Sequence, residues 1–151
     1  MTQDIDETTL RGGWKLVVWQ IDYSDDRPPS YPYGSDADGL LLYTNDGMMS
    51  ANIAYANRSQ LSTESTRHAP ETEKCEAFDS YFSYAGHYHV EDEVVVHRVS
   101  HSLNPNFPGT EQRRHIRFVE GDLELSAQDQ LPGSEVTRTH RLRWRKLASN
   151  Q

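Results

Sequence analysis

AGHYHVEDEVVVHRVSHSLNPNFPGTEQRRHIRFV, residues 85–119, gives the strongest indication of the fold. Short segments rich in turn residues, EDE and LNPNFPG, divide the stretch into runs of β-branched and aromatic residues. Strands joined by connections this short pair antiparallel with their neighbours. The stretch therefore predicts a three-stranded meander with strands at 85–90, 94–101 and 110–119.

Strand signals continue on both sides of this stretch. Asn45-Asp46-Gly47 supplies the positive-φ positions of a tight hairpin between two apolar runs. EAFDSYFSYA (76–85) indicates one short helix or turn that leads back into a strand. The eight expected strands cover residues 13–21, 39–44, 48–55, 85–90, 94–101, 110–119, 123–127 and 136–146.

We therefore expect an all-β fold in which the strands close into an antiparallel barrel. A barrel of about eight strands is just wide enough to hold one small ligand, and a filled sandwich is the alternative. The chain has 151 residues with no repeat and no linker, so we expect one domain over residues 1–151.

Composition restricts the classes of partner. The net charge of -8 disfavours nucleic acid and anionic membrane surfaces. The basic run RTHRLRWRK (138–146) is expected to place alternate cations in water. Cys75 is the single cysteine, so no internal disulfide forms, and its acidic neighbours disfavour a reactive thiolate.

The opening MTQDIDETTL has neither the basic region nor the apolar run of a signal peptide. No stretch approaches the ~20 apolar residues of a membrane-spanning helix. We expect a cytoplasmic protein with no membrane partner, and the sequence gives no oligomeric state.

A polar segment, residues 56–75, interrupts the series of strands before the fourth strand. Long loops inside compact domains are commonly lids or binding loops. We expect either a lid over the barrel mouth or an ordinary surface loop.

The sequence resembles the lipocalin-like domain family of bacterial and fungal small proteins, which have calycin-type barrels. The resemblance lies in GGWKLVVWQ, DGLLLYTNDGMMSANI, AFDSYFSYAGHYHV, VVVHRVSHSLNPNFPGTEQRRHIRF and GDLELSA. Gly12-Gly13-Trp14 is similar to the G-x-W that opens calycin barrels. The resemblance implies a cavity for a hydrophobic ligand and no particular reaction. It also implies that Trp14 stacks under an arginine of the final strand, either Arg143 or Arg145.

Strand alternation selects candidate cavity residues. Arg114 shares a face with Ile116 and Phe118, so it should point inward. A turn centred near Pro105-Asn106 places His97 opposite Arg114, and a tight turn at Asp92-Glu93 places Tyr88 opposite His97. The sequence therefore predicts an inward row of Tyr88, His97 and Arg114.

Such a row has two chemical uses. A buried guanidinium needs an anion or several acceptors, so the row could bind an enolate, phenolate or carboxylate. If the protein is an enzyme, His97, Tyr88 and Arg114 are the catalytic candidates, because an imidazole and a phenol could move a proton. A purely structural network is the third interpretation. The candidate ligand-binding residues are Tyr84, Tyr88, His97, His101, Arg114, Tyr43 and His140.

No HExxH, CxxC or spaced carboxylate–histidine motif is present, so we expect neither metal nor cofactor. The expected function is binding of a small, partly apolar, oxygenated or anionic organic molecule inside the barrel. The alternatives are a cofactor-independent isomerase, cyclase or hydratase that acts on such a molecule, and an interaction subunit with a filled barrel.

Overall fold

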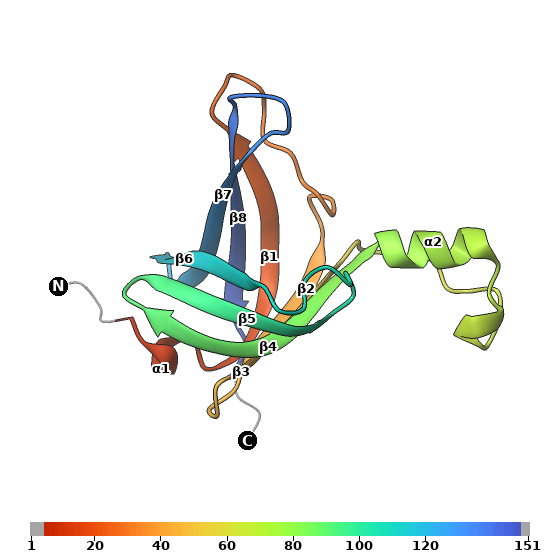
Figure 1. The fold of residues 1–151 in the computed structure, drawn as a ribbon, viewed down its shortest axis with the longest axis horizontal. Helices are drawn as coiled ribbons and strands as arrows, with labels where there is room; N and C mark the ends of the chain where they lie inside the picture. Colours follow the sequence, from red (N-terminus) through yellow and green to blue (C-terminus); the bar gives the residue numbers. More distant parts are fainter. Residues whose placement is uncertain (1–4, 149–151) are drawn as a thin grey trace.

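The computed structural model describes residues 5–148 as a closed β-barrel (Figure 1). Each strand pairs antiparallel with the next, and the last strand returns to pair with the first. The closed eight-stranded barrel expected from the sequence is therefore confirmed. Its strands are β1 (Gly12–Tyr23), β2 (Asp38–Tyr43), β3 (Met48–Ala54), β4 (Tyr81–Glu91), β5 (Val94–Ser102), β6 (Glu111–Val119), β7 (Asp122–Gln130) and β8 (Thr137–Lys146).

Every second side chain of a strand points into the barrel, and these side chains fill its interior. In β3, Met49, Ala51 and Ile53 are buried, whereas the residues between them are partly exposed. The Asn45-Asp46-Gly47 turn joins β2 to β3 as expected, with Gly47 at φ 90°. Among the described residues no helix is long and apolar enough to cross a membrane.

The pairing of β4, β5 and β6 decides which side chains meet in the interior. Tyr88 lies opposite His97, as the tight turn at 92–93 predicts. On the other side His97 lies opposite Gln112, and Arg114 lies opposite Val95, so the predicted His97–Arg114 pairing is wrong by two residues. Two consecutive turns fill the loop between β5 and β6: Phe107 N–H donates to Asn104 O, and Thr110 N–H donates to Phe107 O. The pairing therefore starts where Val99 N–H donates to Thr110 O, and it is not centred on Pro105-Asn106. A shift of two residues preserves the face, so His97 and Arg114 still share it.

A β-bulge interrupts β5 at Ser100. Gly86 pairs with Val99, whereas its neighbour Ala85 pairs with His101. The extra residue reverses the alternation beyond it. His101 is consequently exposed, with its Nδ1 2.8 Å from Ser100 Oγ. The expectation that His101 faces the interior is wrong for this reason.

Helix α1 (Glu7–Leu10) covers one end of the barrel. Leu10 is fully buried, and its carbonyl accepts a hydrogen bond from Trp14 Nε1 at 2.8 Å. Lys146, the β8 residue paired with Trp14, places its Nζ 4.7 Å from the centre of the Trp14 ring. The cation above Trp14 is thus a lysine of the final strand.

Three arginines of β8, Arg141, Arg143 and Arg145, pair with carboxylates on the outer face of the barrel. Arg143 and Arg145 both bind Asp122, and Arg141 Nη1 lies 2.9 Å from Glu124 Oε1. Asp122 and Glu124 are only 6% and 8% exposed, so this face is not simply a row of solvated cations. The expectation that Arg143 or Arg145 stacks on Trp14 is wrong, because alternation directs both side chains outward.

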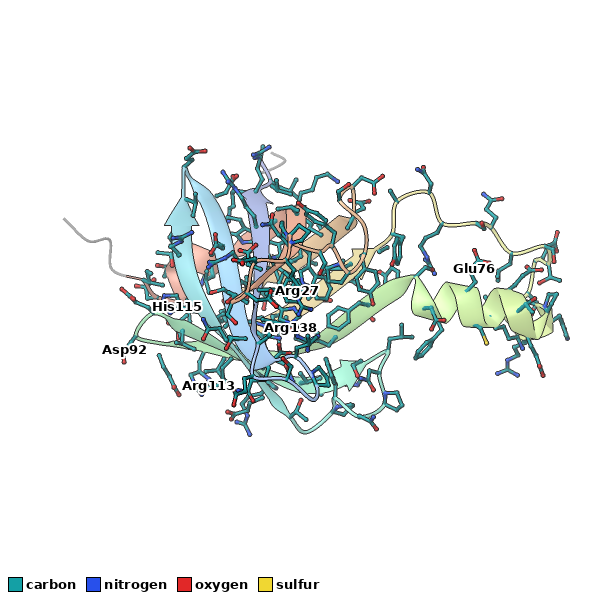
Figure 2. The ribbon with its side chains drawn as sticks, turned by 90° about the horizontal axis from the view of Figure 1, so that it is seen from above. Arg27, Glu76, Asp92, Arg113, His115 and Arg138 are labelled. Carbon is teal, nitrogen blue, oxygen red and sulfur yellow. The ribbon has the colours of Figure 1, made fainter. Side chains whose placement is uncertain are left out.

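The segment between β3 and β4 projects away from the barrel (Figure 1). It contains the 3₁₀-helix η1 (Thr66–His68) and helix α2 (Glu71–Asp79), which has no buried residue. Figure 2 shows Glu76 of α2 well away from the strands. The helix begins earlier than the sequence predicts, and the remainder of 76–85 extends β4 back to Tyr81.

Candidate functional site

The barrel encloses a cavity of about 370 Å³. Most of its wall is aromatic or aliphatic, and a small number of polar side chains enter it from β4 to β8. Such a lining is typical of sites for small organic molecules. The lining residues are Trp19, Leu41, Ala51, Ile53, Phe82, Tyr84, His97, Phe107, Gln112, Arg114, Leu125, Ala127, Gln128, Asp129, His140, Leu142 and Trp144.

A second hollow, of about 560 Å³, lies between residues 55–61 and α2. Its lining consists largely of exposed polar side chains on the projecting segment. It contains no buried titratable group among the described residues, so the barrel cavity is the stronger candidate.

The cavity reaches solvent where Gln128 and Asp129 are exposed, near the end of β7. No residue of 56–75 lines it, so the interpretation of that segment as a lid is wrong. The segment carries its own helix away from the barrel instead. Aromatic residues of other loops lie here: Phe107 lines the cavity, and Tyr33 stacks on Trp19 with ring centroids 5.3 Å apart.

His97 is held between two tyrosines inside the barrel. Its Nε2 lies 2.6 Å from Tyr43 Oη, and its Nδ1 lies 2.6 Å from Tyr84 Oη. Only 2% of His97 is exposed. Burial, assisted by the nearby Arg114 charge, lowers the pKa of His97 to about 3. The imidazole is therefore neutral at physiological pH.

Both tyrosines are held in the phenol form by the same burial. Desolvation raises the pKa of Tyr84 to about 12, and it raises the pKa of Tyr43 well above the ordinary value. Arg114 opposes both shifts, because a cation favours a phenolate. The result is an uncharged chain of three hydrogen-bonding side chains.

Arg114 supplies the positive charge of the cavity. Its Nη1 donates to Arg113 O at 2.9 Å, and its Nη2 donates to Gln112 Oε1 at 3.3 Å. Within residues 5–148, no carboxylate oxygen lies within 4.0 Å of its guanidinium nitrogens. A partly buried guanidinium without an anion favours an incoming oxygen acceptor.

His140 occupies the exposed end of the cavity. Trp19 Nε1 donates to its Nδ1 at 3.3 Å, and its Nε2 lies 3.5 Å from Asp129 Oδ2. Asp129 also binds Arg138 through both carboxylate oxygens. Burial lowers the pKa of His140, and the Asp129 carboxylate partly offsets that effect. Both ring nitrogens are thus engaged by neighbouring side chains.

Tyr88 lies opposite His97 in register but belongs to a different contact. Its ring packs against Tyr43 with centroids 4.6 Å apart, and its hydroxyl donates to Thr44 O at 2.8 Å. It is not among the cavity-lining residues. Side chains lean along a strand, so register alone does not decide which hydroxyl reaches the imidazole. Tyr84, further along β4, takes that position.

The predicted site residues therefore divide into three groups. Tyr84, His97, Arg114 and His140 line one cavity, Tyr43 touches it only through His97, and Tyr88 and His101 lie elsewhere. Within the part of the chain that the structure describes, no group of three or more His, Cys, Asp or Glu side chains could hold a metal ion.

Sequence reasoning missed several lining residues. Simple alternation from Trp14 places Trp19 on the outer face of the barrel. A register shift between Leu16 and Val18 turns it inward instead. Phe107 comes from a loop, where alternation does not apply. Phe82 could have been found, since it shares the parity of Tyr84 in AFDSYFSYA.

Comparison with known proteins agrees with this geometry. No curated protein shows significant similarity to the chain. The family model of the lipocalin-like domain matches residues 11–147, which include every strand of the barrel and every residue that lines its cavity. Barrels of this kind suggest small-molecule binding in general. The chain belongs to the lipocalin-like domain family.

Proposed function

We propose that the barrel binds one small, partly apolar organic molecule that carries a carbonyl oxygen or an anionic group. The observation that carries this proposal is Arg114, a guanidinium inside an aromatic cavity with no carboxylate partner among the described residues. An acceptor oxygen at this position would gain a charge-assisted hydrogen bond. The apolar part of the molecule would lie against Trp19, Phe82 and Leu142.

The size of the cavity limits the ligand. About 370 Å³ is near the lower end of the range of ligand sites in proteins, roughly 300–1,000 Å³. A bicyclic aromatic carboxylate is therefore a suitable probe. Naphthoate is such a molecule.

A cofactor-independent isomerase, cyclase or hydratase is the alternative. Arg114 and Tyr84 could stabilise an enolate, which is the charge such reactions develop. His97 is poorly suited as the base, because both its nitrogens are hydrogen-bonded and its pKa is lowered to about 3. Tyr84 lines the cavity, but burial raises its pKa to about 12, which makes its hydroxyl a weak acid. These features favour binding over turnover.

The test compares two neighbouring arginines. Arg114→Met removes the cavity charge, whereas Arg113→Met removes a charge on the outer face, where Arg113 contacts Glu91. Isothermal titration calorimetry with naphthoate should show a loss of affinity of about 10- to 100-fold for Arg114→Met, the usual worth of a hydrogen bond to a charged group. Arg113→Met should bind like the unaltered protein. Equal affinities in all three proteins would contradict the proposal.

A further inference from the structure

The contacts of His97 determine the direction of the hydrogen bonds around it. A neutral imidazole has one nitrogen that donates and one that accepts. Both nitrogens of His97 have a tyrosine hydroxyl at 2.6 Å. One tyrosine must therefore donate to the ring, and the other must accept from it.

Tyr43 determines which arrangement holds. It is 2% exposed, and within residues 5–148 His97 Nε2 is the one hydrogen-bond partner of its hydroxyl. If Tyr43 accepted from the ring, its own hydroxyl hydrogen would be buried without an acceptor, which proteins avoid. Tyr43 therefore donates to Nε2, and the ring proton lies on Nδ1.

Protonation of His97 at Nδ1 determines the role of the Tyr84 hydroxyl. Its oxygen accepts from His97 Nδ1–H, so its own hydrogen is free for another partner. Tyr84 lines the cavity, and Tyr43 does not. The free hydrogen of the chain is thus available on the cavity side.

We propose that Tyr43 and His97 hold the Tyr84 hydroxyl as a donor to the cavity, so that Tyr84 and Arg114 together select a ligand oxygen that only accepts hydrogen bonds. This inference rests on the proposed ligand-binding function and names its ligand class: ketones, enolates and carboxylates. Tyr84 is the specificity residue in contact with the ligand, and Tyr43 is a positioning residue that acts through His97. An alcohol or amine would use its acceptor lone pair here, but its hydrogens would face two donor groups.

The first experiment needs no ligand. Imidazole nitrogen chemical shifts in the unaltered protein distinguish a protonated from an unprotonated ring nitrogen. We expect a protonated Nδ1 and an unprotonated Nε2 for His97. The opposite tautomer would overturn the proposal, whether or not a ligand binds.

The second experiment measures selectivity with a matched pair of probes. Naphthyl methyl ketone has an acceptor oxygen, and isopropenylnaphthalene replaces that oxygen with a methylene group of similar size. Tyr84→Phe should weaken ketone binding about 10-fold and leave isopropenylnaphthalene binding unchanged, as expected for loss of one hydrogen bond. Tyr43→Phe frees the imidazole to take either tautomer, so it should weaken ketone binding in the same direction without touching the cavity.

Tyr81→Phe is the control, because it removes a hydroxyl that donates to Asn52 at 3.0 Å, away from the cavity lining. It should bind both probes like the unaltered protein. An equal effect of Tyr84→Phe on both probes, or none on either, overturns the selection by Tyr84. Failure of the unaltered protein to bind any probe counts against the proposed function instead. If a variant does not fold, the tautomer measurement on the unaltered protein still decides the direction of the hydrogen bonds.

Discussion

Gly86→Ala should be among the most damaging single-methyl substitutions in the barrel. A Cβ at residue 86 would lie 1.9 Å from the backbone oxygen of Arg98 and 3.0 Å from the nitrogen of Ser100. These are backbone atoms of the β5 bulge, so no side chain can rotate away to relieve the contact. Normal packing requires about 3.4 Å or more between such atoms, and β5 would have to move by more than 1 Å.

The expected cost has two parts. Overpacking in a well-packed interior costs about 1–3 kcal/mol. Displacement of the bulge also breaks one or two ladder hydrogen bonds between β4 and β5, each worth about 1 kcal/mol. We therefore expect the free energy of unfolding to fall by about 2–5 kcal/mol, measured by urea denaturation at unchanged m-value.

Gly109→Ala is the matched control. Gly109 has φ 89°, and an added Cβ would meet no atom within 4 Å. Only the strain of the left-handed backbone remains, which costs about 1–2 kcal/mol. Gly86→Ala should thus be clearly the more destabilising variant. If it costs no more than Gly109→Ala, the close approach of β4 to the bulge is not a feature of the folded protein.

Two further predictions concern pH and proteolysis. His97 has a folded-state pKa of about 3, below the unfolded value of about 6.5, so the unfolded chain binds a proton that the native state excludes. The contribution of His97 to the free energy of unfolding should therefore be lost as the pH drops from about 6.5 towards 3, by up to about 1.4 kcal/mol per pH unit. His97→Gln should reduce the slope of stability against pH by that amount in acid denaturation curves, and an unchanged slope would contradict the buried neutral imidazole. Limited proteolysis should first cut the exposed segment between β3 and β4, which makes few contacts with the barrel, and naphthoate should not protect it because none of residues 56–75 lines the cavity. Protection by naphthoate would restore the interpretation of this segment as a lid.

The sequence predicts the strands well because two local signals coincide. Side chains alternate along each run, and turn residues such as Asn45-Asp46-Gly47 separate the runs. Register across a tight turn follows from counting, which is why Tyr88 is correctly placed opposite His97. Counting fails across the longer β5–β6 loop, because two consecutive turns fill it and the pairing is shifted by two residues from the expected register.

The candidate site is harder to predict than the strands because bulges change the face of every residue beyond them. The bulge at Ser100 turns His101 outward, and the register shift after Leu16 turns Trp19 inward. Neither irregularity has a distinct signature in the sequence. Hydrogen bonding adds a second difficulty: the choice of Tyr84 over Tyr88 as the partner of His97 depends on how each ring leans.

The contrast between outer and inner arginines bears most directly on function. On the outer face Arg141, Arg143 and Arg145 each have a carboxylate partner from β7. Arg114 faces a cavity in which it has backbone and amide acceptors but, among residues 5–148, no carboxylate. A partly buried charge that has only neutral acceptors is stabilised further when an anion meets it. The three outer-face arginines of β8 thus have their anions within the fold, whereas Arg114 has, at the cavity, a charge whose anionic partner is best supplied by a ligand.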